Sequence, residues 1–324
     1  MTETANPDRS PATPFRIFAA EFTRLYQLET CRKTCYRVAQ VLREVAGHGV
    51  CRVGDLDDPV LIAEWLKTMR KSDGGDRSGT TKRGLLKVLE IACKYAVGRG
   101  YLARSPFDAW NHRIATTKPR AKRHHPYADL ARLIEDLRID SVLGWKQHRL
   151  YAVIATLAMT GLRKAECLHL QARDIDLDNR TLTVSARFHL KTPESERTIG
   201  LPDALAAALG PWFREAKIGS NNGADSWLFP NCYGSGFWHE GKAKNRPLAA
   251  VKAAGLRSGI SGLTILSFRH TFATLGPYQW DLSETVIAQI LGHTSTVMTR
   301  RHYIHQDVPE LVKVARIINF SHRA

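Results

Sequence analysis

The spacing of apolar residues in the first third of the chain predicts a small helical unit. Apolar positions recur at helical intervals over residues 15–26 and again over 38–45. Gly47 and Gly49 end the second of these helices, and Asp58-Pro59 begins a third one, with its apolar face between 62 and 69. A fourth helix is predicted from about residue 78 to residue 97.

The later part of the chain combines helical patterns with one short region of alternating residues. Helices are predicted over about 127–138 and 147–160. Between residues 175 and 201 the apolar positions follow a period of two, and turn signals at Asp178-Asn179 and at 192–195 separate the runs. This pattern predicts a small three-stranded antiparallel sheet. Further helices are predicted over about 203–215, 247–258, 268–275, 283–291 and 309–317.

The expected fold class is therefore mainly α with a small antiparallel β-sheet, organised as two domains. The boundaries are predicted as a flexible tail (1–13), a helical domain (14–110), a basic linker (111–125), a second domain (126–318) and a short tail (319–324). The linker contains five Lys or Arg residues and no acidic residue, as is typical of a segment that lies along phosphates. Because only residues 1–13 precede the first helix, no separate arm-binding domain is expected.

The charge of the chain favours a polyanionic partner. With 47 Lys and Arg against 31 Asp and Glu, the net charge is +16 among 324 residues. Nucleic acid is the first candidate, and an anionic membrane surface is the alternative. No apolar stretch approaches the roughly 20 residues of a membrane-spanning helix. The N-terminal residues also lack the apolar core of a secretory signal, so a cytoplasmic protein without a membrane partner is expected.

The six cysteines do not form a dense disulfide framework. Cys31, Cys35, His48 and Cys51 have a spacing that superficially resembles a zinc site. Cys31 and Cys35, however, fall within a helical pattern in which small buried thiols are common, and we favour that interpretation. No metal or cofactor is expected.

Five residues in the second domain suit chemistry at a phosphodiester. In order they are Arg163 in Thr-Gly-Leu-Arg-Lys-Ala-Glu, Lys191, Arg269 in Ser-Phe-Arg-His, His293 in Leu-Gly-His, and Tyr303. Guanidiniums bind the non-bridging oxygens of a phosphate through a planar fork of donors and remain charged at working pH. Cations of this kind can stabilise a phosphoryl transition state, and a tyrosine among them can attack the phosphorus. Glu166 follows Arg163 closely enough to orient it or to cap the next helix.

The order and local contexts of these residues resemble the tyrosine recombinases of the phage integrase family. The segment 98–107, Gly-Arg-Gly-Tyr-Leu-Ala-Arg-Ser-Pro-Phe, is similar to the one that closes the helical core-binding domain of that family, and Leu-Ser-Phe-Arg-His-Thr-Phe-Ala-Thr resembles its second arginine motif. The resemblance implies a DNA clamp made of a core-binding domain and an α+β catalytic domain. It also implies that Arg163 and Arg269 hold the scissile phosphate, that Lys191 protonates the departing 5′ oxygen, and that Tyr303 is the nucleophile, assisted by His293.

Two departures from the family pattern bear on activity. Leu266 occupies the position of the family's histidine three residues before Arg269, and leucine can neither donate a hydrogen bond nor transfer a proton. His270 could compensate in part, although a structural role is the better interpretation. Tyr303 follows His293 by ten residues, whereas the commonest family spacing is nine, which here falls on His302.

Candidate DNA-binding residues lie in the fourth predicted helix and in the linker. They are Thr80, Thr81, Lys82, Arg83, Lys87, Lys118, Arg120, Lys122 and Arg123. Lys87, Lys242 and Lys244 are also weaker competitors of Lys191 for the role of general acid.

The predicted activity is site-specific DNA recombination or integration, as in mobile elements, through a 3′-phosphotyrosine intermediate. The resemblance implies a homotetramer on double-stranded DNA, and it is compatible with a monomer in solution. The helix expected over 308–318 either docks on a neighbouring subunit or packs within its own. Three other functions stay open: a type IB topoisomerase, a catalytically weakened or inactive DNA-binding relative, and a basic helical interaction protein without DNA chemistry.

Overall fold

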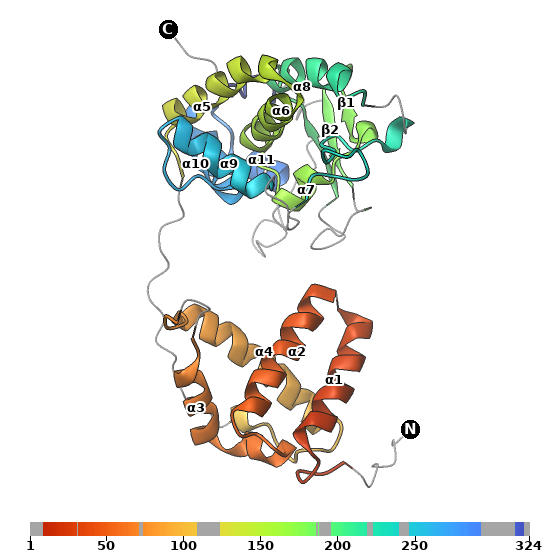
Figure 1. Cartoon of the computed structure of the whole chain (residues 1–324), viewed down its shortest axis with the longest axis vertical. Helices are drawn as coiled ribbons and strands as arrows, with labels where there is room; N and C mark the ends of the chain where they lie inside the picture. Colours follow the sequence, from red (N-terminus) through yellow and green to blue (C-terminus); the bar gives the residue numbers. More distant parts are fainter. Residues whose placement is uncertain are drawn as a thin grey trace. The chain divides into compact units, whose positions relative to one another are not determined.

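A computed structural model describes most of the chain, namely residues 9–30, 32–70, 74–108, 124–185, 187, 196–218, 223–239, 246–292 and 315–320. The chain divides into two compact units, residues 1–120 and 121–324 (Figure 1). The mainly helical class with a small antiparallel sheet is confirmed. In the described part of the chain, no helix has the length and apolar character that crossing a bilayer requires.

Unit 1 is helical and has its own core. Its elements are α1 (Phe15–Glu29), α2 (Arg32–Gly47), η1 (Val53–Asp57), α3 (Pro59–Thr68), α4 (Gly79–Gly98) and η2 (Pro106–Asp108). Two of these helices start where the sequence predicts. Asp58 caps α3 by accepting hydrogen bonds from Val60 and Leu61, and Ser78 caps α4 by accepting one from Thr81. Cys35 is buried and its thiol lies 3.0 Å from the hydroxyl of Thr30, as expected of a small core residue.

The predicted N-terminal tail is too long, since its last residues belong to unit 1. Arg9 forms an ion pair with Glu21 at 3.2 Å, and the carbonyls of Pro11 and Thr13 accept hydrogen bonds from Gly54 and Val53. These backbone bonds satisfy groups that a free tail would leave to water. The packed chain therefore begins before residue 14.

Unit 2 is built around one helix, α6 (Trp145–Thr160), that is buried over most of its length. Its helices are α5 (Tyr127–Asp140), η3 (Ser141–Leu143), α6 (Trp145–Thr160), α7 (Lys164–Leu168), η4 (Ala172–Asp174), α8 (Asp203–Glu215), η6 (Gly223–Asp225), α9 (Pro247–Arg257), α10 (Ile265–Gln279) and α11 (Glu284–Leu291). Every residue from 148 to 160 is buried, as is typical of a helix surrounded on all sides. Figure 1 shows α6 in the middle of the unit, where it contacts α5, α8, α9 and α10.

The three strands of unit 2 are short and antiparallel, in the order β1 (Ile175–Asp176), β2 (Thr181–Val184) and β3 (Arg197–Gly200). Leu182 pairs with Ile175 on one side and Ile199 on the other. The predicted turn at Asp178-Asn179 is confirmed, because Asp176 accepts hydrogen bonds from the backbone of both residues. Residues 188–195, which contain the second predicted turn, lie outside the described residues.

Two sequence expectations for unit 2 need correction. The helix expected over 268–275 is longer, because the side chain of Thr264 caps it by accepting a hydrogen bond from Ser267 and the helix continues through Pro277. The C-terminal tail was predicted to start at 319, but Phe320 is buried and its ring lies 5.2 Å from that of Tyr127. Most of the helix expected over 309–317 lies outside the described residues.

Candidate active site

Arg163 lies at the break between the central helix α6 and the short helix α7. Gly161 ends α6 in the left-handed conformation, with φ +61°, and donates its N–H to Leu157. A Cβ atom at Gly161 would lie 2.5 Å from the side chain of Leu291 and 3.1 Å from Phe272. Only glycine fits both this backbone conformation and this close approach, so the predicted break at Gly161 is confirmed.

Glu166 fixes the direction of the Arg163 guanidinium. Its Oε2 accepts a hydrogen bond from the Arg163 backbone N–H at 2.8 Å, and its Oε1 accepts one from Arg163 Nη1 at 2.6 Å. Burial alone would raise the pKa of this carboxyl, whose side chain is only 3% exposed, but the positive charge of Arg197 and hydrogen bonds from Arg197 and Arg163 hold it below its ordinary value. Glu166 is therefore a buried carboxylate that both caps α7 and orients Arg163, which covers both roles expected from the sequence.

Arg269 extends from α10 towards the same break. Its Nη1 donates to the carbonyl of Gly161 at 3.1 Å, and its Nη2 donates to the carbonyl of Leu291 at 2.7 Å. Burial and then the nearby charge of Arg163 lower the pKa of Arg269 to about 10. The guanidinium remains charged near neutral pH, and the two arginines predicted to hold a phosphate lie in one cluster.

A third arginine, Arg197 on β3, joins this cluster although the sequence analysis did not single it out. Its Nη2 donates to Glu166 Oε2 at 3.0 Å, and its Nε donates to the carbonyl of Ile290 at 2.8 Å. A signal was present in the sequence, because Arg197 shares a strand face with the buried residues Ile199 and Leu201. An arginine on the buried face of a strand requires a partner, and this one predicts an ion pair.

The three guanidiniums bind three consecutive backbone carbonyls at the C-terminal end of α11. Arg197 binds Ile290, Arg269 binds Leu291, and Arg163 binds Gly292 at 2.9 Å. Carbonyls at a helix C-terminus lack partners within the helix and carry partial negative charge. The cluster therefore fixes the point from which the chain continues towards His293 and Tyr303.

The charge of the cluster is unbalanced in favour of an anion. Three guanidiniums surround one carboxylate among the described residues, and Arg163 keeps 29% of its side chain exposed. Burial is the main cause that lowers the pKa values of Arg269 and Arg197, and the positive charge of Arg163 lowers both further, an effect that an additional anion would oppose. The arrangement suits a phosphate with two non-bridging oxygens.

The remaining predicted catalytic residues are Lys191, His293 and Tyr303, and all three lie outside the described residues, as do Lys242 and Lys244. Their roles stay predictions. Leu266 is described, in the first turn of α10 and one turn before Arg269, and it is 60% exposed.

Leu266→His is expected to increase the rate of DNA strand cleavage. A donor at this position would add a hydrogen bond to the charged transition state, and a single such donor is worth about 10²–10³ in rate elsewhere. We expect the single-turnover cleavage rate to rise about tenfold. This gain is smaller than that of a native donor, because the surrounding residues are not arranged to hold the added imidazole. Leu256→His, on α9 with 68% of Leu256 exposed, is the matched control and should change nothing. An unchanged rate in Leu266→His would mean that this position does not face the phosphate.

The candidate DNA-binding residues of α4 lie in its first turns. Thr80, Thr81, Arg83 and Lys87 are exposed, while Lys82 is partly buried and forms an ion pair with Asp76 at 2.9 Å. Thr80, Arg83 and Lys87 are separated by three and four residues, so they share one helix face. Lys118, Arg120, Lys122 and Arg123 lie outside the described residues.

Arg37 on α2 extends the basic face of α4 and was missed in the sequence. It is exposed, and a Cβ at Gly84 of α4 would lie 3.0 Å from its Nη2. Gly84 thus lets the Arg37 guanidinium approach the same stretch of α4 that carries Arg83 and Lys87. Only the packing of α2 on α4 brings Arg37 to this face, so its helical pattern alone gave no signal.

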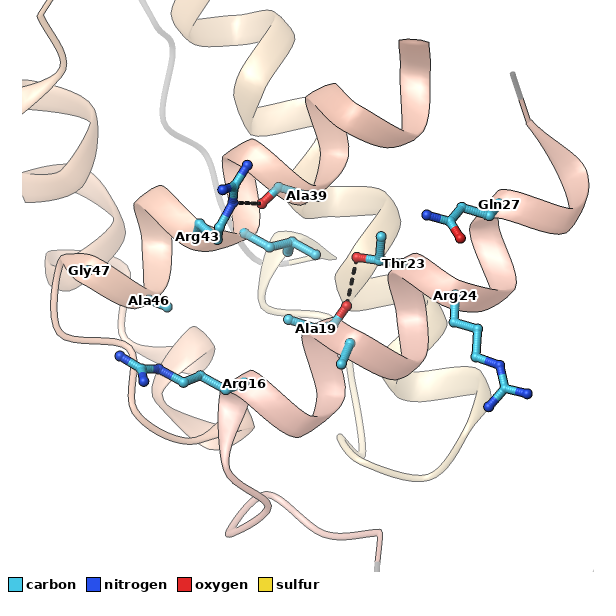
Figure 2. A pocket seen from close by; sticks show the side chains of 11 residues that line it. Arg16, Ala19, Thr23, Arg24, Gln27, Ala39, Arg43, Ala46 and Gly47 are labelled. Carbon is cyan, nitrogen blue, oxygen red and sulfur yellow. Dashed lines mark hydrogen bonds between the residues drawn. The ribbon is translucent and has the colours of Figure 1, made fainter. Parts of the chain in front are cut away.

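Unit 1 also has a groove of about 700 Å³ between α1 and α2, which none of these candidates lines (Figure 2). Its floor is formed by small and apolar residues, among them Ala19, Ala39 and Leu42, and three arginines lie around it: Arg16, Arg24 and Arg43. The Arg43 Nε donates to the carbonyl of Ala39 at 3.3 Å, so this side chain bonds within its own helix.

Unit 2 thus has a mainly helical fold with an anion-binding arginine cluster where its central helix ends. Residues 127–310, more than half of the chain, match the phage integrase family, and the chain belongs to that family. It is 28% identical over 246 residues to the tyrosine recombinase XerC of Xanthomonas axonopodis pv. citri (strain 306), which covers 74% of this chain and 72% of that protein.

Solved structures share the fold. An integrase of the transposon Tn1549, in complex with a circular intermediate DNA, is similar with a TM-score of 0.68 and 19% identity over 92% of this chain and 97% of that one. A lambda integrase fragment, in a dimer bound to a COC′ core site, is similar with a TM-score of 0.63 and 16% identity over 91% of this chain and 100% of that one. The expectation of a tyrosine recombinase fold is confirmed.

Proposed function

We propose that this protein is a site-specific DNA recombinase that cuts and rejoins strands through a 3′-phosphotyrosine intermediate. The observation that carries the proposal is the pair of predicted phosphate ligands, Arg163 and Arg269, held by hydrogen bonds at adjacent carbonyls, Gly292 and Leu291. Family membership and the names of the relatives support the same activity.

The proposed cleavage step is an exchange of one phosphorus–oxygen bond for another. The phenolic oxygen of Tyr303 releases its proton to the surrounding water and bonds to the scissile phosphorus as the bond to the 5′ oxygen breaks. Lys191 donates the proton that the departing 5′ oxygen receives. Arg163 and Arg269 bind the non-bridging oxygens on which negative charge develops, and His293 adds to this field. The bond energy is kept in the phosphotyrosine, so a 5′ hydroxyl can reseal the strand by the reverse step.

The partner in this proposal is double-stranded DNA. The exposed face of α4 and the basic residues of 111–125 supply cations for its phosphates, and the net charge of +16 supports such binding. We also propose that four copies act on two DNA sites, because the two duplexes together have four strands, and each strand is cut once and rejoined crosswise. A cytoplasmic location is part of the proposal, because the protein must reach its DNA substrate.

A suicide substrate tests the proposal. DNA from the regions flanking this gene is prepared with a nick close to the cleavage position, so that a short fragment is lost after cleavage and the strand cannot be resealed. The expected result is a protein–DNA adduct that survives denaturation, with the phosphate on Tyr303 when the peptide is mapped by mass spectrometry.

Two other results would overturn the proposal in different ways. Sequence-specific footprints on the flanking DNA without any adduct would identify a DNA-binding relative that has lost catalysis, the alternative in which Leu266 marks that loss. Relaxation of supercoiled plasmid by dilute protein, with no exchange between two sites at any concentration, would identify a topoisomerase.

A further inference from the structure

Arg197 joins three parts of the candidate site, and none of the predicted catalytic roles includes it. Its side chain, 11% exposed, extends from β3 to the buried carboxylate of Glu166 and to the carbonyl of Ile290 at the end of α11. A Cβ at Gly292 would lie 2.6 Å from its Nη1, so the guanidinium lies directly against the backbone of that residue. Gly292 also has φ +61°, a conformation that favours glycine.

The hydrogen bonds of Arg197 use its whole guanidinium. Nε is bonded to Ile290, Nη2 to Glu166 Oε2 at 3.0 Å, and Nη1 lies 3.4 Å from Glu166 Oε1. All three nitrogens of the guanidinium therefore contact protein oxygens. Arg163, in contrast, is more exposed, with 29% of its side chain accessible.

The contacts of Arg197 also connect the segments that carry the other candidates. Arg197 begins β3, and Lys191 precedes it by six residues in the same connection between β2 and β3. Ile290 lies in the last turn of α11, three residues before His293. Glu166, which shares its two oxygens between Arg197 and Arg163, orients the arginine predicted to bind the phosphate.

We propose that Arg197 is a positioning residue for strand cleavage, which sets the Arg163 guanidinium and the start of the Tyr303 segment relative to each other. Without Arg197, the Glu166 carboxylate and the carbonyl of Ile290 each lose the hydrogen bonds that Arg197 donates, so Glu166 is held from the side of Arg163 alone. A misplacement of about 1 Å in such a site can lower a rate by about 10²-fold. This inference rests on the proposed function.

The test compares Arg197→Ala and Arg197→Lys with the wild type on the suicide substrate. Arg197→Ala is expected to lower the single-turnover cleavage rate by about 10²-fold, while the dissociation constant for DNA stays within about threefold. Added guanidinium ions should restore part of the rate, at concentrations that leave the unfolding temperature unchanged. Arg197→Lys should recover little, because an ammonium cannot bridge Glu166 and Ile290 as a planar fork does.

Arg180→Ala is the matched control. Arg180 lies in the turn before β2 and forms an exposed ion pair with Asp203 at 3.3 Å, so its loss removes a cation of the same sheet without touching Glu166. Its cleavage rate should equal that of the wild type.

Three results would overturn the inference. Weaker DNA binding in Arg197→Ala, with an unchanged rate at saturating DNA, would make Arg197 a phosphate ligand. If the cleavage rate of both Arg197 variants decreases only in proportion to the fraction of folded protein, and guanidinium does not restore it, the role of Arg197 is purely structural. Wild-type cleavage in a folded Arg197→Ala would leave it without a role. If the wild type binds the DNA in a footprint but forms no adduct, the proposed function itself is wrong. This result is distinct from the three above, in which the wild type forms the adduct.

Discussion

Tyr303→Phe is expected to abolish the covalent adduct with DNA while leaving DNA binding intact. The substitution removes one oxygen, which is the atom that the proposed mechanism bonds to phosphorus, and changes neither the size nor the aromatic character of the side chain. Arg163 and Arg269 hold their positions through Glu166 and through the carbonyls of Gly161, Leu291 and Gly292. Phosphate binding should therefore be unaffected, and adduct formation on the suicide substrate should fall below detection.

The control for this prediction is Tyr278→Phe. Tyr278 lies on α10, is 88% exposed, and has no counterpart in the family motif, so its loss should not change the adduct yield. His302→Ala addresses the unusual spacing, because the commonest family spacing from His293 falls on residue 302. An adduct that persists in Tyr303→Phe would mean that the nucleophile is assigned to the wrong residue.

Glu166→Ala is expected to destabilise unit 2 by about 3–5 kcal/mol, the cost of removing one partner from a buried ion pair. The positive charges of Arg197 and Arg163 would then lie close together without the carboxylate that now pairs with both, and Arg269 is a third positive charge nearby. The backbone N–H of Arg163 would also lose its acceptor. Denaturant unfolding monitored by tryptophan fluorescence measures the change in the free energy of unfolding.

The matched control for Glu166→Ala is Glu135→Ala. Glu135 forms an exposed pair with Arg138 three residues away on α5, and exposed pairs contribute only about 0–1 kcal/mol. Equal losses in the two variants would contradict the view that the buried cluster supports this unit.

The contribution of the Glu166 carboxylate should also appear in the pH dependence of the free energy of unfolding. The folded-state pKa of Glu166 lies below its ordinary value of 4.5, despite burial, because of Arg197 and Arg163. Its stabilising contribution is therefore fully present above about pH 4.5 and is lost as the pH falls through the lower, folded-state pKa. The stability difference between the wild type and Glu166→Gln should shrink below pH 4.5, and a constant difference down to pH 3 would contradict this assignment.

Much of the fold could be predicted from the sequence because its signals are local. Gly161 had to end a helix, Asp178-Asn179 had to form a turn, and Asp58 and Ser78 were suitable N-caps for α3 and α4. The apolar periodicity gave the number of helices in unit 1 and the small sheet of unit 2. The bounds of α7 were not predicted, because five residues are too few to show a period, although Glu166 was expected to cap a helix there.

The arrangement of the site could be predicted only in part. Arg163 and Arg269 were found through their motifs, but their hydrogen bonds reach residues up to 129 positions away, which no local pattern encodes. Arg197 lies in none of the segments on which the resemblance was based, and its importance depends on the carboxylate and the helix end that the fold brings to it. The placement of Lys191, His293 and Tyr303 stays a prediction.

The carbonyls of residues 290–292 accept hydrogen bonds from arginines on β3, on α10 and at the start of α7. These bonds determine where along the sequence an insertion can be tolerated. Insertions upstream of Gly292 would break them, whereas the additional residue before Tyr303 falls downstream of Gly292. A change in the number of residues between Gly292 and Tyr303 therefore leaves the positions of the arginines unchanged. The unusual spacing of Tyr303 is compatible with an intact phosphate-binding pair, Arg163 and Arg269.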